Sequence, residues 1–126
     1  MPSRPTIARL RTAALVALCA AWLLANTGAQ AMSIRELRAV EKSDKQQGGN
    51  YKRYYLVGVM EGVLAAQEQG VRAGAMPTIC LNGRRLLPSM AEELFQTEMR
   101  RNSDFYEADM PVALVMGNAL ATVYAC

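Results

Sequence analysis

The three cysteines of this chain, Cys19, Cys80 and Cys126, constrain its fold more than any other residues do. Cys19 lies in a segment with the pattern of a secretion signal, so Cys80 and Cys126 are the two expected in a mature protein. In an oxidising compartment, two remaining cysteines are expected to form one disulfide. A structural role is favoured over a redox role because the chain has no Cys-x-x-Cys pair.

The N-terminal segment has the three parts of a secretory signal peptide. A basic region with three arginines is followed by an apolar run over residues 13–24 and then by Ala29-Gln30-Ala31, a small-x-small cleavage pattern. The apolar run is shorter than the roughly 20 residues that a membrane-spanning helix needs. We therefore interpret residues 1–31 as a cleaved signal peptide. The alternative is an uncleaved N-terminal anchor.

Residues 32–126 remain, which is enough chain for one domain with one modest core. This part holds all 11 acidic residues and 11 of the 14 basic residues. The formal charge of +3 therefore comes from the three arginines of the signal segment. The domain itself gives no electrostatic reason to expect nucleic acid or an anionic membrane surface as a partner.

Apolar residues recur at helical spacing in several stretches of the domain, which predicts helices. The first is a short helix that begins at Ser33, three residues before Glu36, as in a capping box. Residues 42–50 are polar and are expected to form a flexible loop. The second helix is expected over residues 51–69, with Gly70 as the left-handed residue that ends it.

A third helix is predicted to begin near Ser89, which has capping-box spacing to Glu92, and a fourth is predicted after Pro111. Between the second and third helices, Asn82-Gly83 predicts a tight turn. No stretch predicts a sheet. We therefore expect an all-α fold, a small bundle of about four helices clamped by one disulfide.

The second predicted helix carries two glycines, Gly58 and Gly62, beside the aromatic positions Tyr51 and Tyr55. Each glycine costs a helix about 1 kcal/mol relative to alanine, so we expect another segment to pack close to the backbone there. Another helix of the same chain is the favoured neighbour, and a dimer seam is the alternative. Glu61, next to this face, is expected to be partly buried.

The chain contains no histidine, so it lacks the commonest general base and the commonest metal ligand. Ser-His and Cys-His nucleophile pairs are also excluded, and there is no phosphate-binding glycine loop and no zinc spacing of cysteines. The carboxylates of the third predicted helix, Glu98 among them, are expected on a solvated face. We expect no enzyme, no cofactor and no metal site.

Three features together are typical of one family. They are the Tyr-x-x-Gly-x-x-x-Gly pattern of Tyr55, Gly58 and Gly62, the segment Ile79-Cys80, and a terminal helix that ends in Cys126. With the signal segment, the chain resembles the Rap/Tai immunity proteins, which protect bacteria against type VI secretion amidase effectors. The resemblance covers about residues 51–126.

This resemblance implies a small helical periplasmic protein, often dimeric, that binds a peptidoglycan-cleaving amidase and blocks its active-site groove without catalysis. Cys80 and Cys126 would then be the disulfide of the family. The chain departs from the family pattern at two places where prolines are common, since Leu81 follows the first cysteine and Ala125 precedes the last. These departures concern loop geometry more than the fold.

An inhibitor of a groove enzyme needs a rigid, protruding surface, and Arg and Tyr are frequent anchors at such interfaces. The third predicted helix and its flanking loops best fit this requirement. The predicted contact residues are Arg84, Arg85, Glu92, Glu93, Gln96, Arg100, Phe105 and Tyr106. Ordinary surface charge is the alternative for the arginine pairs.

The leading hypothesis is thus a periplasmic immunity or inhibitor protein whose partner is a secreted amidase, with a homodimer as a further expectation. The second is a small helical periplasmic chaperone that exposes apolar surface when its carboxylates are protonated. The third is an accessory component of an envelope machine. An enzyme is the least favoured class.

Overall fold

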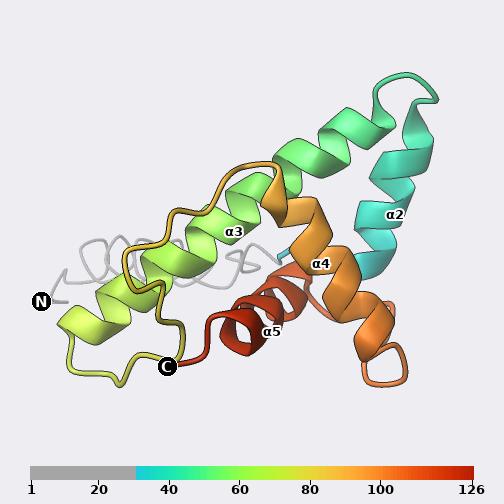
Figure 1. The fold of residues 1–126 in the computed structure, drawn as a ribbon. Helices are drawn as coiled ribbons and strands as arrows, with labels where there is room; N and C mark the ends of the chain where they lie inside the picture. Colours follow the sequence, from blue (N-terminus) through green and yellow to red (C-terminus); the bar gives the residue numbers. More distant parts are fainter. Residues whose placement is uncertain (1–30) are drawn as a thin grey trace, which may run out of the picture. The chain divides into compact units, whose positions relative to one another are not determined.

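The computed structural model describes residues 31–126, so the interpretation of the preceding residues as a signal peptide lies outside the described part. Within it the chain forms four helices and no strand (Figure 1). The predicted all-α fold of about four helices with one disulfide is confirmed. The helices are α2 (Ile34–Ser43), α3 (Gly48–Arg72), α4 (Met90–Arg101) and α5 (Val112–Val123).

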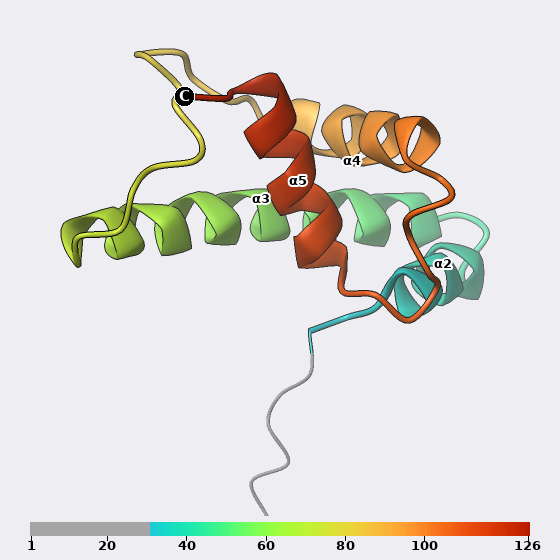
Figure 2. The same cartoon turned by 90° about the horizontal axis from the view of Figure 1, so that it is seen from below.

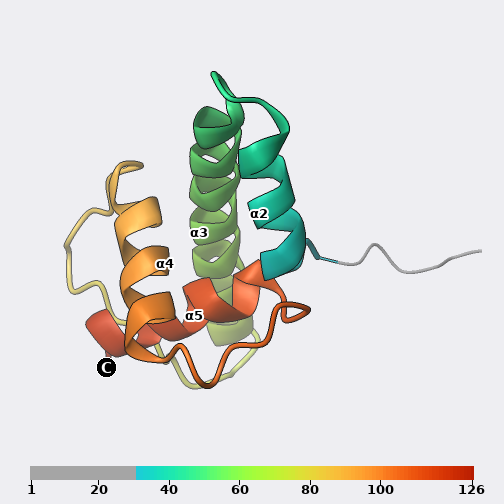
Figure 3. The same ribbon diagram turned by 90° about the vertical axis from the view of Figure 1, so that its right-hand side faces the viewer.

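Helix α3 is the longest helix in this part of the chain, and α2, α4 and α5 all contact it. Figure 2 shows α5 crossing α3, and Figure 3 shows α2 and α4 on opposite sides of α3. Helix α4 also packs against α5. The apolar faces of the four helices therefore meet in one core. Its buried apolar residues are Ile34, Leu37, Leu56, Met60, Ile79, Ala91, Leu94, Phe95, Tyr106, Val112, Val115, Met116, Ala119, Leu120 and Tyr124.

One of the two predicted capping boxes forms. At the start of α2, the Ser33 hydroxyl accepts from the backbone N–H of Glu36, and a Glu36 carboxylate oxygen accepts from the backbone N–H of Ser33 at 2.7 Å. The second prediction is wrong, because the Ser89 side chain makes no capping hydrogen bond to α4. Glu92 instead pairs with Lys52 of α3, so a contact distant in sequence replaces the local one.

Helix α3 begins and ends three residues beyond its predicted limits. The Asp44 carboxylate accepts from the backbone N–H groups of Gln46 and Gln47 at 2.8 and 2.9 Å, which makes a tight connection in place of the predicted flexible loop. The connection brings Gly48 so close to the backbone of Glu41 that any side chain at this position would collide with the Glu41 carbonyl. Gly70 stays helical and does not end the helix.

The disulfide between Cys80 and Cys126 is present, with the two Cα atoms 4.9 Å apart. Beside it, the backbone N–H of Cys80 donates to the carbonyl of Tyr124 at 2.7 Å. The predicted turn follows directly: Asn82 and Gly83 have φ angles of 51° and 78°. The segment before α4 is therefore fastened to the end of α5 by a covalent bond and by a backbone hydrogen bond.

The prediction that another helix packs against Gly58 and Gly62 is wrong within residues 31–126. Gly58 and Gly62 are exposed, and no atom of the described residues lies within 4 Å of where a Cβ would stand on either. Tyr51 is 50% exposed, whereas Tyr55 is half-buried against the core. Glu61, expected to be partly buried, is exposed. The dimer seam stays a prediction that these contacts do not test.

Alanine at Gly58 or Gly62 is expected to stabilise the chain by about 0.5–1 kcal/mol each, because the position is open and alanine is the better helix former. Gly83→Ala is expected to cost about 1 kcal/mol, since its left-handed backbone disfavours a Cβ. Urea unfolding of the three variants measures both effects. A loss of stability in Gly58→Ala would contradict the open surface and would favour a dimer seam.

Candidate functional site

One side of helix α4 is joined to α3 by charged groups. The Gln96 side-chain amide donates to Oε1 of Glu92 at 3.0 Å, and Lys52 Nζ of α3 lies 2.9 Å from the same oxygen. Arg53 Nε lies 3.6 Å from the other oxygen of Glu92. The carboxylate of Glu92, a predicted partner contact, is therefore already engaged within the chain, and Gln96 is engaged with it.

Lys52 connects three helices, because Nζ also lies 2.7 Å from Oε1 of Glu41 in α2. Its side chain is only 12% exposed. Burial by itself lowers the pKa of Lys52, but the hydrogen bonds to Glu41 and Glu92 outweigh it and the pKa is raised. The hydrogen bond from Lys52 is the largest influence on Glu92 and lowers the pKa of that carboxyl against the effect of burial.

Lys52→Met is expected to lower the free energy of unfolding at pH 7 by about 2 kcal/mol, because two carboxylates lose the cation between them. The lowered pKa of Glu92 means that its contribution is present above pH 4.5, its ordinary value, and disappears as the pH falls through the lower value of the folded state. The raised pKa of Lys52 means that its contribution is lost only above pH 10.5. Urea unfolding at pH 7 and at an acidic pH below the folded-state pKa of Glu92 should therefore show a large difference between variant and parent only at pH 7.

The matched control for this prediction is Arg72→Met, which removes an exposed pair with Glu68 on α3. Surface pairs of this kind contribute at most about 1 kcal/mol. An equal loss in Lys52→Met at both pH values would mean that packing of the lysine stem, and not its charge, joins the three helices.

The loop between α4 and α5 presents one aromatic side chain to solvent and turns the next one inward. Phe105 is 59% exposed, and its ring lies edge-on to the ring of Tyr106, with centroids 5.1 Å apart. Tyr106, predicted as a partner contact, is only 9% exposed. That prediction is wrong, because the ring fills the space between α4 and α5 and its hydroxyl is bonded to both helices.

A buried hydrogen-bond network holds Tyr106 in place. Its hydroxyl donates to Oε1 of Glu98 at 2.6 Å and accepts from the Asn118 side-chain amide at 2.9 Å. The Asn102 side-chain amide donates to the same oxygen of Glu98 at 2.8 Å. Burial is the main reason that the pKa of Tyr106 is raised, and the bond to Glu98 adds to it.

Glu98 is 4% exposed, so the expectation of a solvated carboxylate was wrong at this residue. Its position could have shown this, because Glu98 follows Ala91, Leu94 and Phe95 at the i, i+3, i+4, i+7 spacing of one helical face. Because glutamate is polar, Glu98 was not recognised as part of the buried face. The donors that make its burial tolerable, Asn102 and Tyr106, lie 4 and 8 positions further along the chain, and Asn118 of α5 donates in turn to the Tyr106 hydroxyl.

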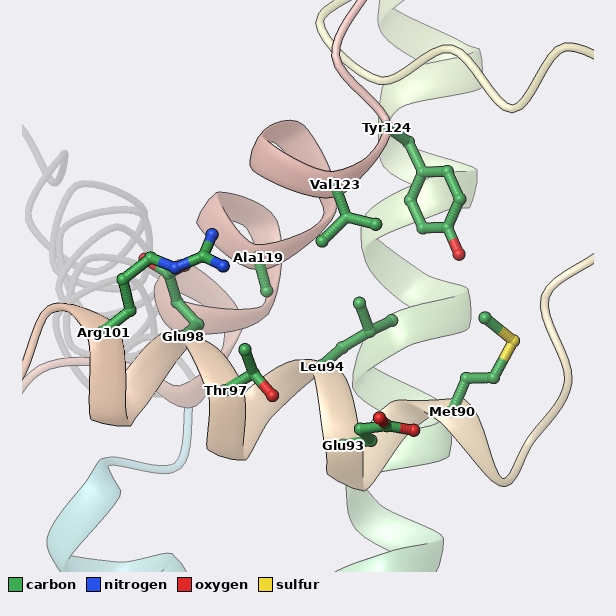
Figure 4. A pocket seen from close by; sticks show the side chains of 9 residues that line it. All are labelled: Met90, Glu93, Leu94, Thr97, Glu98, Arg101, Ala119, Val123 and Tyr124. Atoms are coloured by element: carbon green, nitrogen blue, oxygen red, sulfur yellow. The ribbon is translucent and has the colours of Figure 1, made fainter.

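Glu98 stands at one end of a groove between α4 and α5 with a volume of about 240 Å³ (Figure 4). Leu94, Ala119 and Val123 form its middle, and Met90 and Tyr124 lie at the far end (Figure 4). The whole lining is Met90, Glu93, Leu94, Thr97, Glu98, Arg101, Ala119, Val123 and Tyr124. Of the predicted contact residues, the groove includes only Glu93.

The predicted arginine contacts lie on exposed positions outside the groove lining. Arg84 places its guanidinium 4.8 Å from the centre of the Tyr124 ring and donates to the carbonyl of Leu81. Arg85 is exposed in the loop before α4, and Arg100 is exposed near the end of α4. The eight predicted residues are thus split between the α3 side of α4, the groove, the loop before α4, the exposed end of α4 and the region of Phe105.

Within residues 31–126, no three His, Cys, Asp or Glu side chains group closely enough to hold a metal ion. In the same part of the chain, no helix has the length and apolar character needed to span a membrane. No protein-family model matches the sequence, and no curated protein and no solved structure matches it. A family assignment therefore depends on the motif residues alone.

Proposed function

We propose that this chain is a periplasmic immunity protein that binds a secreted type VI peptidoglycan amidase and blocks its active-site groove. The observation that carries the proposal is Phe105, an exposed aromatic side chain on a loop that is fastened at both ends. The disulfide supports an oxidising compartment such as the periplasm. The amidase as partner is supported by the motif resemblance of residues 51–126.

The loop that carries Phe105 is held by backbone hydrogen bonds. The N–H of Phe105 donates to the carbonyl of Asn102 at the end of α4, at 3.0 Å. At the other end, the N–H groups of Ile34 and Arg35 donate to the carbonyls of Met110 and Ala108, at 3.0 and 2.8 Å. The inward ring of Tyr106 anchors the middle.

A side chain presented in this way loses little conformational freedom on binding. In protein–protein interfaces, aromatic side chains that become buried in the partner also provide much of the binding energy. Phe105 has charged neighbours in Asp104 and Glu107, which are exposed and would form a polar rim around it. An apolar anchor with a polar rim is the arrangement that insertion into the groove of another protein requires.

The test is inhibition of secreted peptidoglycan amidases from the same host, measured with the purified chain in its oxidised form. Phe105→Ala is expected to weaken binding about 30-fold or more while leaving thermal stability unchanged, because the ring is largely exposed. Tyr54→Ala removes another exposed aromatic, on α3, and is the matched control.

Failure to inhibit any secreted amidase would overturn the proposal. Equal losses in the Phe105 and Tyr54 variants would leave an inhibitor whose contact surface is not the loop. Capture of many unfolded proteins at acid pH, without inhibition of an amidase, would favour the chaperone hypothesis instead.

A further inference from the structure

We propose that the groove between α4 and α5 receives one basic side chain, lysine or arginine, of a protein partner, with Oε2 of Glu98 accepting from its charged head. The inference deepens the proposed function, on which it rests only for the identity of the partner. The recognition chemistry itself follows from the groove. It is argued from the free oxygen of Glu98, from the apolar walls and from the charges at the rim.

Glu98 presents one oxygen to the groove and keeps the other inside. Among the hydrogen bonds of residues 31–126, Tyr106 and Asn102 both donate to Oε1, and none reaches Oε2. Yet no fully buried side-chain oxygen or nitrogen in this part of the chain lacks a partner. Glu98 lines the groove between α4 and α5, so we infer that Oε2 is the oxygen available to a ligand there.

The network behind Glu98 fixes the direction in which this oxygen points. Tyr106 and Asn102 hold Oε1 from two directions, and Asn118 in turn holds the Tyr106 hydroxyl. A carboxylate that is 4% exposed and held in this way is already desolvated and oriented before a ligand arrives. Charge-assisted hydrogen bonds are the strongest that such an oxygen can accept.

The size and walls of the groove suit a single long side chain. Its volume of about 240 Å³ is below the roughly 300–1,000 Å³ of pockets that enclose whole small molecules. Leu94, Ala119 and Val123 supply apolar walls between the two ends (Figure 4). Lysine and arginine bury their methylene stems against apolar surface while the charged head reaches a polar group.

The charges of the lining favour a cation. Glu93 and Glu98 are acidic, and Arg101 is the one basic residue that lines the groove. Arg101 is exposed and takes part in none of the ion pairs of residues 31–126, although it lies at the same end as Glu98 (Figure 4). The positive charge of Arg101 would therefore repel an incoming basic side chain, so removing this charge is expected to tighten binding.

The experiment titrates the ¹⁵N-labelled chain with three blocked amino acids and follows backbone amide shifts by NMR. The probes are N-acetyl-lysine methylamide, N-acetyl-arginine methylamide and N-acetyl-norleucine methylamide, which is neutral and has the four side-chain carbons of lysine without the ammonium group. The two cationic probes are expected to shift the amides of Thr97, Glu98 and Ala119 in a saturable manner. The neutral probe is expected to bind about tenfold more weakly.

Four variants test which residues hold the probes, and one of them is a control. Glu98→Gln should weaken the cationic probes about tenfold, because its amide can keep the bonds from Tyr106 and Asn102 but cannot attract a cation. Val123→Lys, at a position that is 48% exposed, should block the probes with its own ammonium even if Glu98→Gln proves unstable. Arg101→Ala should tighten binding, and Glu107→Gln on the exposed loop should change nothing.

Equal binding of the neutral probe, or unchanged binding in Glu98→Gln, would overturn the inference. Weaker binding of the cationic probes in Arg101→Ala would also overturn it, because the arginine would then hold the bound probe and not repel it. If the chain inhibits the amidase and both Glu98→Gln and Val123→Lys inhibit equally well, this inference fails while the proposed function stands. If the probes bind as expected and no amidase is inhibited, the proposed function fails and the groove chemistry stands.

Discussion

Replacing Cys80 and Cys126 together with serine is expected to lower the free energy of unfolding by about 4 kcal/mol. The disulfide spans 46 positions, and the chain-entropy model gives about this value for a closed loop of that length. Domains of this size have a total stability of roughly 5–15 kcal/mol, so the bridge would supply a large fraction of it. Urea unfolding of the oxidised chain and of the double variant measures the difference.

The loss of stability should be largest near the disulfide. In the serine variant the segment before α4 would still be held by the Gln67 side chain, whose amide oxygen accepts from the N–H of Ile79 at 2.8 Å, and by the bond from Cys80 N–H to Tyr124. We expect hydrogen exchange to accelerate most around Ile79 and Tyr124 while α2 stays protected. A double variant with less than about 1 kcal/mol of destabilisation would show that these hydrogen bonds suffice without the disulfide.

Leu120→Ala is expected to cost about 3 kcal/mol, which corresponds to a fall in Tm of roughly 15 °C. Leu120 is 0% exposed and lies on α5, which packs against both α3 and α4. Truncating its side chain removes apolar contacts and leaves a cavity that a core built from several helices cannot fully close. Thermal unfolding followed by circular dichroism measures the fall.

The same helix supplies the control. Leu114→Ala makes the identical chemical change at a position that is 41% exposed, and it is expected to cost less than about 1 kcal/mol. Similar losses in the two variants would contradict the burial of the α5 face that carries Leu120. The comparison separates burial from helix propensity, because both variants exchange leucine for alanine within one helix.

Features that depend on residues near in sequence could be predicted without the structure. The capping box of Ser33 and Glu36, the turn at Asn82-Gly83 and the buried stripe of α5 follow from spacing, and all are present. The disulfide could be predicted as well, because only two cysteines follow the signal-like segment. The predicted capping box at Ser89 does not form, because Lys52 of another helix binds Glu92, and this contact cannot be read from local spacing.

The candidate site depended on contacts between α4, the loop after it and α5. The face of a helix on which Glu98 lies follows from periodicity, but its burial is tolerable only because Tyr106 and Asn102 bring donors to it. In the same way, the exposure of Gly58 and Gly62 depends on which elements pack elsewhere on α3.

The amino-acid sequence by itself thus determined the helices, their stripes and the disulfide, because hydrophobic periodicity, capping and cysteine pairing act over short spacings or between unique residues. Only the tertiary structure decided which polar groups are internal. A carboxylate can be buried only where hydrogen-bond donors replace water. The donors of Glu98 reach it because the loop after α4 folds back onto the helix and Asn118 of α5 holds the Tyr106 hydroxyl. Tyr106 turned inward and Phe105 outward for this reason, although the two are adjacent in the sequence.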